Sequence, residues 1–211
     1  MFITFEGPEG SGKSTQIALL CQALRERGHD VLQTREPGGT PIAEQIRDVI
    51  HNIENTAMLP TAEALLYSAA RAQHVAVKVV PALAEGTIVV SDRYAQSTMA
   101  YQGYGHGLDL KELAAITQFA TGGLRPDLII YLDLPIEAGL GRKQRDREQG
   151  KGEWNRMDQL KDAFHRRVRQ GYLLMAEEDP ERWLIIDASL DIDTVHATIL
   201  DSVERRWADR G

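Results

Sequence analysis

The residues with the clearest chemical meaning lie near the start of the chain, after a short apolar run. Residues 7–14 read G-P-E-G-S-G-K-S and match the pattern G-x-x-x-x-G-K-[ST]. In such a loop the backbone N–H groups converge on a polyphosphate, the lysine reaches its outer oxygens, and the next hydroxyl can ligate Mg²⁺. A helix expected after the loop adds its partial positive charge. The pattern predicts a nucleoside triphosphate site made by Gly7, Pro8, Glu9, Gly10, Ser11, Gly12, Lys13, Ser14 and Thr15.

Charged residues follow two later apolar runs, where strands are expected to end. Arg35 follows residues 31–34, and Asp92 and Arg93 follow residues 87–91. An arginine can bind a phosphate group bidentately, and a carboxylate beside the loop can organise Mg²⁺ or its waters. Each feature also has a structural explanation, because Arg35 could be a surface cation before a turn and Asp92 could pair with Arg93.

A third group lies on a predicted helix. Tyr67, Arg71 and His74 are spaced i, i+4 and i+7, so they share one face of that helix. A flat ring beside a planar set of donors can hold a nucleobase by stacking and by hydrogen bonds to a ring oxygen. On their own, these residues would favour the alternative of a tyrosine at the edge of the core with a solvated arginine.

A basic run occupies residues 142–156 and is interrupted by glycines. Charge runs usually mark a solvated face. In an acidic chain, a basic run close to the other candidates favours a lid that closes over a transferring phosphoryl group and excludes water. Its basic residues are Arg142, Lys143, Arg145, Arg147, Lys151 and Arg156.

Composition limits the remaining possibilities. The 211 residues are 43% hydrophobic, which fits one globular α/β domain over residues 1–211. A formal net charge of −7 argues against a nucleic-acid partner, since surfaces that follow phosphates are normally basic. No apolar run approaches the ~18 residues needed to span a membrane. The single cysteine, Cys21, excludes a disulfide framework, and together these features predict a cytoplasmic protein.

Five apolar runs separated by helical patterns predict a parallel sheet with helices on both faces. In such sheets ligands bind at the carboxyl ends of the strands, so the phosphate loop, Arg35, Asp92 and Asp133 are expected to meet at one edge. The predicted strands are 2–5, 31–34, 87–91, 128–134 and 183–187. The predicted helices are one ending at Arg27 before Gly28, one from Pro41 capped by Thr40, 61–80 capped by Thr61 and interrupted near Pro81, 109–121, one from Pro135, 158–178 and a last amphipathic helix.

Together these motifs resemble the bacterial thymidylate kinases, a family of phosphate-loop nucleoside monophosphate kinases. The resemblance covers nearly the whole chain. It implies transfer of the γ-phosphoryl group of ATP to dTMP, giving dTDP and ADP, with Mg²⁺ as cofactor and a homodimer as the assembly. The segments that carry it are E-G-P-E-G-S-G-K-S-T (6–15), T-R-E-P-G-G-T (34–40), Y-S-A-A-R (67–71), S-D-R-Y (91–94), S-T-M-A-Y-Q-G (97–103) and R-P-D-L-I-I-Y-L-D (125–133).

The resemblance also implies roles for individual residues. On the dTMP side, Glu9 approaches the deoxyribose 3′-hydroxyl, Arg35 and Arg93 hold the phosphate, Tyr67 stacks on thymine, Arg71, Thr98 and Gln102 bond the base, and Tyr101 crowds the 2′ position. The metal would take Ser14 and Asp92, and the catalytic residues would be Lys13, Asp92, Arg93 and a lid arginine. Residues 8–11 of the phosphate loop are not basic, so the resemblance assigns that arginine to the lid, with Arg142 favoured over Arg145 and Arg147.

Two other classes of protein stay open at this point. A deoxynucleoside kinase would share Lys13, Asp92 and Arg93 but would not need further arginines for an acceptor that carries its own phosphate. A nucleotide-gated switch is disfavoured because the chain has no N-K-x-D guanine-reading motif. The alanine-rich side of helix 61–80, away from Tyr67, is the expected face of a homodimer.

Overall fold

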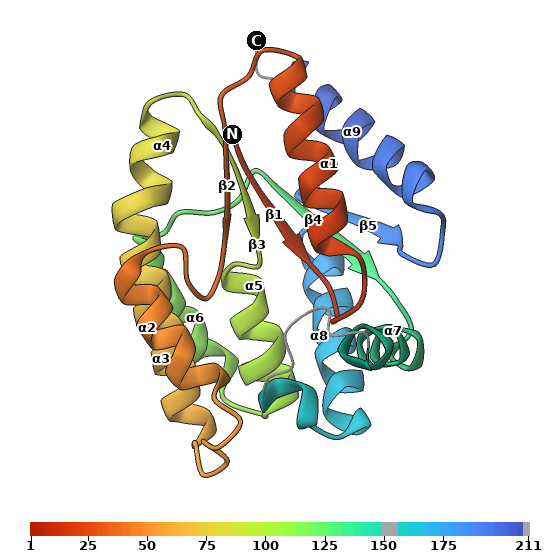
Figure 1. Cartoon of the computed structure of the whole chain (residues 1–211). Helices are drawn as coiled ribbons and strands as arrows, with labels where there is room; N and C mark the ends of the chain where they lie inside the picture. Colours follow the sequence, from red (N-terminus) through yellow and green to blue (C-terminus); the bar gives the residue numbers. More distant parts are fainter. Residues whose placement is uncertain (149–155, 209–211) are drawn as a thin grey trace.

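In the computed structural model, which describes residues 1–148 and 156–208, all five strands are parallel and form one sheet in the order β2-β3-β1-β4-β5 (Figure 1). The predicted sheet is confirmed, and no strand boundary differs from the prediction by more than one residue. The strands are β1 Phe2–Glu6, β2 Val31–Arg35, β3 Ile88–Asp92, β4 Leu128–Asp133 and β5 Trp183–Asp187.

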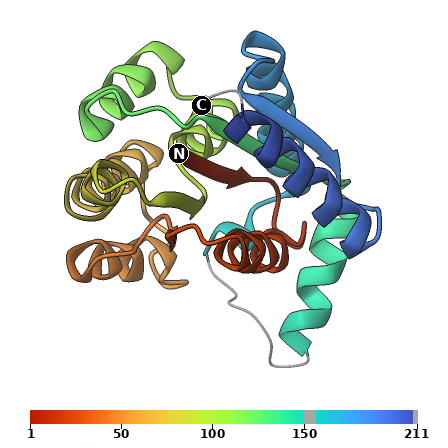
Figure 2. The ribbon, with the colours of Figure 1, turned by 90° about the horizontal axis from the view of Figure 1, so that it is seen from above.

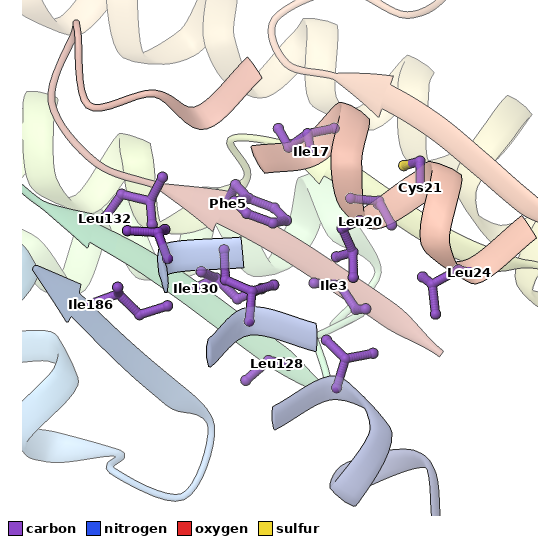
Figure 3. Packing of buried hydrophobic residues seen from close by; sticks show 14 of the residues in the cluster. Ile3, Phe5, Ile17, Leu20, Cys21, Leu24, Leu128, Ile130, Leu132 and Ile186 are labelled. Carbon is purple, nitrogen blue, oxygen red and sulfur yellow. The ribbon is translucent and has the colours of Figure 1, made fainter. Parts of the chain in front are cut away.

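Alternate strand residues bury against helices on opposite faces of the sheet. Helices α1 (Lys13–Glu26) and α9 (Ile192–Ala208) cover one face, where Ile3 and Phe5 lie in the largest apolar cluster. Figure 3 shows Ile17, Leu20, Cys21 and Leu24 of α1 packed on this face. Seen from above in Figure 2, further helices lie on the opposite side of the sheet, where Phe2 and Val89 point.

Side chains cap the N-termini of two helices, and Thr40 does so as the sequence predicts. Thr40 accepts a hydrogen bond from the N–H of Ala43 at the start of α2 (Pro41–His51). Asp109 accepts from two backbone N–H groups at the start of α6 (Leu110–Thr121), and Gly122 closes that helix in the left-handed conformation, with φ 60°. These residues leave little freedom in where the chain turns.

The long helix expected over 61–80 differs from the prediction at both ends. Helix α3 (Pro60–His74) begins one residue earlier, with Leu59 rather than Thr61 at its N-cap. At the other end the helix is not interrupted, because a π-helical segment (η1, Val75–Val79) leads into α4 (Val80–Ala84), which contains Pro81. The wider π turn accommodates a proline that has no N–H and would crowd a preceding carbonyl.

Two further segments depart from the sequence-based assignment. Residues 95–105, given no element, form α5 (Ala95–Thr98) and a π-helical segment (η2, Met99–Gly105). The helix expected from residue 158 begins later, as a 3₁₀ turn (η3, Arg156–Gln159) followed by α8 (Asp162–Glu178). The predicted lid, 142–156, starts inside α7 (Ile136–Glu148), and residues 149–155 lie outside the described part.

The register brings the carboxyl ends of the strands to one edge of the sheet. Asp92 pairs with both Phe5 and Arg35, and Asp133 pairs with Asp187. Helix α7 lies at this edge (Figure 1). No helix within the described residues is long and apolar enough to cross a membrane. The cytoplasmic location stays a prediction.

Candidate active site

A cavity of about 960 Å³ opens at the carboxyl edge of the sheet, where the sequence places the ligand. It brings the phosphate loop together with the residues after β2 and β3. The predicted site residues that line it are Glu9, Gly10, Ser11, Gly12, Lys13, Ser14, Thr15, Arg35, Tyr67, Asp92, Arg93, Thr98, Tyr101, Gln102 and Arg142.

The phosphate loop has the backbone that its glycines permit. Gly7, Gly10 and Gly12 have φ of 145°, 73° and 86°, which disfavour a side chain. A Cβ at Gly7 would lie 2.7 Å from the Leu132 carbonyl oxygen, whereas Gly12 faces open space. The loop is therefore shaped by β4 on one side and is open on the side where a phosphate would lie.

Lys13 Nζ lies inside this loop. It donates hydrogen bonds of 3.1 Å to the Gly7 carbonyl oxygen and 2.9 Å to that of Pro8. Burial and the nearby charge of Arg93 lower the pKa of Lys13, while Glu9 and Asp92 oppose that shift. An incoming polyphosphate would supply the negative charge that favours the protonated amine.

Two residues that line this part of the cavity each carry a buried oxygen without a hydrogen-bond partner among the described residues. These oxygens are Ser11 Oγ and Asp92 Oδ1. With the exposed Ser14 hydroxyl at the start of α1, Asp92 offers the hard oxygen ligands that Mg²⁺ prefers. No group of three or more His, Cys, Asp or Glu that could hold a metal occurs in the described residues. A magnesium ion here would take most of its ligands from phosphate and water.

Arg93 has the one positive φ among the described non-glycine residues, 69°. Its guanidinium donates to Glu9 Oε1 at 2.5 Å, to Ser97 Oγ at 3.2 Å and to the Tyr101 hydroxyl at 3.3 Å. It also lies 5.2 Å from the centre of the Tyr101 ring. These contacts hold the planar group of donors at the cavity wall.

Glu6 is a buried residue behind the cavity wall that sequence reasoning missed. The fully buried carboxylate accepts hydrogen bonds from the Tyr94 N–H (2.9 Å), Ser97 Oγ (2.7 Å) and the Tyr172 hydroxyl (2.8 Å). Burial raises the pKa of Glu6, against the lowering effect of Arg93. The sequence did carry a signal for Glu6, because it is a charged residue at the end of a buried strand, β1.

The segment after β2 places Arg35 at the cavity. Arg35 Nη2 pairs with Glu44 Oε2 on α2 at 2.9 Å, and the Gly39 N–H donates to Glu44 Oε1 at 2.8 Å. The Glu36–Pro37 peptide bond is cis. Half of the Arg35 side chain is exposed, so the group is accessible to an anion.

Arg71 is placed differently from the other predicted base-contacting residues, because it does not line the cavity. It is 2% exposed. Its guanidinium donates to Glu36 Oε2 (2.7 Å), Thr98 Oγ1 (2.9 Å) and the Tyr94 carbonyl oxygen (2.9 Å). His74 joins this group through Glu36 Oε1 at 2.9 Å. Direct contact of Arg71 with a base stays a prediction.

Arg142 is the lid arginine that the described structure brings to the cavity. Its Nη1 lies 3.4 Å from the carbonyl oxygens of Gly10 and Ala188. Arg145 is exposed and bonds to the Gly141 carbonyl oxygen of its own helix. The side chain of Arg147 lies outside the described part of the structure.

Sequence reasoning also missed Glu63 and the contact made by Arg156. Glu63 is 1% exposed and binds Gln102, and Arg156 pairs with the same carboxylate. Glu63 precedes Tyr67 by four residues and therefore shares the helical face of Tyr67 and Arg71. That spacing could have identified Glu63 from the sequence.

Comparison with known proteins identifies relatives of the whole chain. The family model "Thymidylate kinase" matches residues 5–199, most of the chain. The chain belongs to the thymidylate kinase family. It is 50% identical to the thymidylate kinase of Trichlorobacter lovleyi, over 99% of both chains. It is also 50% identical to that of Roseiflexus castenholzii, over 97% of this chain and 93% of the relative.

A solved structure supports the same relationship. The crystal structure of thymidylate kinase from Ehrlichia chaffeensis aligns with a TM-score of 0.76 and 31% identity, covering 96% of this chain and 98% of that one. The expected fold and the expected activity are therefore confirmed: the chain is an ATP-dependent kinase of dTMP. Roles of individual residues are a separate question.

Proposed function

We propose that ATP and dTMP meet within this one cavity, with the ATP phosphates in the phosphate loop and the dTMP phosphate between Arg35 and Arg93. The supporting observation is that the same cavity joins Lys13 to a second set of cations. A nucleoside acceptor would not require that second set, because it carries no phosphate. The bound substrates are two anions, and positioning them end to end is the main task.

The base of dTMP is placed at the far wall of the cavity. Tyr67 stacks on the ring, and Thr98 and Gln102 hydrogen-bond its edge. Tyr101, held beside Arg93, crowds the position of a ribose 2′-hydroxyl. Glu9 faces the sugar. Arg71 supports this wall from behind through its bond to Thr98.

Magnesium would be held by Ser14 and Asp92, directly or through water. The orphaned Asp92 Oδ1 fits this assignment. When bound, the ion screens the negative charge of the phosphates. The protein would supply two oxygen ligands near Lys13, one from Ser14 in the first turn of α1 and one from Asp92 at the end of β3.

The chemistry needs no protein base, because the attacking phosphate oxygen is already ionised at neutral pH. Lys13, Arg93 and Arg142 neutralise the charge on the transferring group and hold the two phosphates in line. Segment 142–156 acts as a lid that brings Arg142 to this position and excludes water.

A homodimer is the proposed assembly, through the exposed side of α3 and its neighbour α6. Leu65 on α3 is 51% exposed, Val77 on the adjoining η1 is 58% exposed, and Phe119 on α6 is 90% exposed. Burying such side chains between two copies would stabilise the pair. Sedimentation of the wild type and of Phe119→Asp tests this: the wild type should sediment as a dimer and the variant should dissociate.

Product analysis tests the proposed acceptor. With ATP and Mg²⁺ supplied, ADP release should require dTMP and should not occur with thymidine. Equal ADP release with thymidine would favour a deoxynucleoside kinase. Release independent of any acceptor would favour a nucleotide-gated switch.

A further inference from the structure

Glu63 lies behind Gln102, on the side away from the cavity. Its Oε1 accepts a hydrogen bond of 2.6 Å from Gln102 Nε2. Gln102 lines the cavity, whereas Glu63 on α3 is almost fully buried and does not. The amide nitrogen of Gln102 is therefore committed to Glu63.

The surroundings of Glu63 favour its ionised form. Arg156 Nη2 pairs with Oε2, and His106 Nε2 lies 3.3 Å from Oε1. Arg156 is itself anchored by a 3.2 Å hydrogen bond from Nε to the Ile50 carbonyl oxygen. Burial acts to raise the pKa of Glu63, but the contacts with His106, Arg156 and Gln102 outweigh it and leave the pKa below its ordinary value.

An ionised carboxylate can only accept hydrogen bonds, whereas an amide can turn either its NH₂ group or its oxygen toward a partner. Glu63 thus removes that choice for Gln102. Within the described residues, Gln102 Oε1 has no hydrogen-bond partner. The amide oxygen of Gln102 is therefore left to accept a hydrogen bond from a ligand.

We propose that Glu63 is a positioning residue that sets base specificity by holding Gln102 Oε1 as the acceptor for the ring N3–H of thymine. This inference rests on the placement of the base beside Gln102 under the proposed function. Thymine and uracil both carry an N3–H donor. Cytosine has a lone pair at N3, which would face the amide oxygen and leave both groups unpaired. The arrangement excludes cytosine and does not distinguish thymine from uracil.

The test compares kcat/KM for dTMP, dUMP and dCMP in the wild type, Glu63→Gln, Gln102→Leu and the double variant. The Glu63→Gln amide can donate as well as accept, so Gln102 becomes free to turn over. The ratio of dTMP to dCMP turnover is expected to fall about tenfold or more, mainly through the KM for dTMP, with dUMP following dTMP. In the Gln102→Leu background, Glu63→Gln should not change the ratio further.

Glu137→Gln is the matched control, because it removes the carboxylate partner of Arg166, 2.6 Å away, on an exposed surface. Its base ratio should equal that of the wild type. Thermal unfolding shows whether each variant is folded. Should Glu63→Gln not fold, Glu63→Asp keeps a charge for Arg156 but withdraws it from Gln102, and the ratio should fall in the same direction.

A purely structural role predicts a different result. If Glu63→Gln lowers dTMP and dCMP turnover by the same factor, or shifts the ratio equally in the Gln102→Leu background, the role of Glu63 is overturned. If Gln102→Leu leaves the ratio unchanged, the placement of the base is wrong and the proposal fails with it.

Discussion

Arg93 Nη2 and Glu9 Oε1 lie 2.5 Å apart, so the segment after β3 and the phosphate loop meet directly across the cavity. This pair joins the residue proposed to hold the dTMP phosphate to the residue proposed to face its sugar. Under the proposed placement of dTMP, one ion pair therefore links the residues assigned to its phosphate and its sugar.

Arg93→Lys should lower kcat/KM for dTMP by about a hundredfold or more, because lysine keeps the charge but not the planar set of donors. Steady-state kinetics at saturating ATP measure the effect. The control is Arg182→Lys, since Arg182 makes a comparable pair with Asp179 away from the cavity. Near-normal kcat/KM of Arg93→Lys would show that the planar arrangement of the Arg93 donors is not needed for turnover of dTMP.

Glu6→Gln should change how stability depends on pH. Because the pKa of Glu6 is raised in the folded protein, the folded state holds this proton to higher pH than the unfolded chain does. The contribution of Glu6 to the free energy of unfolding is therefore largest at low pH and is lost as pH rises above the ordinary value of 4.5. Urea unfolding of both proteins from pH 4 to 8 should show the wild type losing stability relative to Glu6→Gln.

The exposed Glu112 provides a comparison for that series. Glu112→Gln should follow the wild-type curve closely. A constant difference between wild type and Glu6→Gln over the whole range would contradict a raised pKa at Glu6.

Tyr67→Ala should weaken dTMP binding by ~1–3 kcal/mol, the usual contribution of one aromatic–base stack. Tyr67→Phe should bind nearly as well as the wild type, because it retains the ring. Isothermal titration calorimetry with dTMP measures both affinities. Equal affinity in all three proteins would place the base elsewhere.

Arg142→Ala should lower kcat by about a hundredfold or more with little change in the KM for dTMP, because the interaction forms only as charge redistributes during transfer. Arg145→Ala and Arg147→Ala serve as comparisons from the same segment. If all three variants retain near-normal turnover, the lid does not supply a catalytic arginine.

Asp92→Asn should raise the Mg²⁺ concentration needed for half-maximal rate by roughly tenfold, as expected when a metal-orienting carboxylate is lost. A magnesium titration of the steady-state rate shows the shift, and chelation by EDTA should stop the wild type reversibly. Asp179→Asn, far from the cavity, should keep the wild-type requirement.

Much of the fold follows from local chemistry in the sequence. The apolar runs, three of which have Arg35, Asp92 and Asp133 at their ends, locate all five strands to within one residue, and Thr40 caps a helix as predicted. Residues 95–105 could not be assigned, because π-helical turns have no simple hydrophobic period. The sequence predicted that the helix is interrupted near Pro81, but the preceding π-helical turn lets the helix continue through this proline.

The site was predictable where a motif carries its own geometry, as in the phosphate loop. It was less predictable where two distant segments share a buried polar group. Glu6 meets Tyr172 across 166 positions, and Glu63 meets Arg156 across 93. Such partners depend on where the fold brings α8 beside β1 and η3 beside α3, which no spacing rule in a single sequence expresses.

The hydrogen bonds of the Arg71 guanidinium limit how the substrate range of this pocket can change by evolution or engineering. They tie together Glu36 beside the Arg35 segment, Thr98 at the base wall and the backbone of Tyr94. Under the proposed placement of dTMP, we expect a substitution that reshapes the base-binding wall to disturb the phosphate-binding residues as well. Shifting the substrate range should call for compensating changes introduced as a set, and a stepwise route would pass through intermediates with poor turnover.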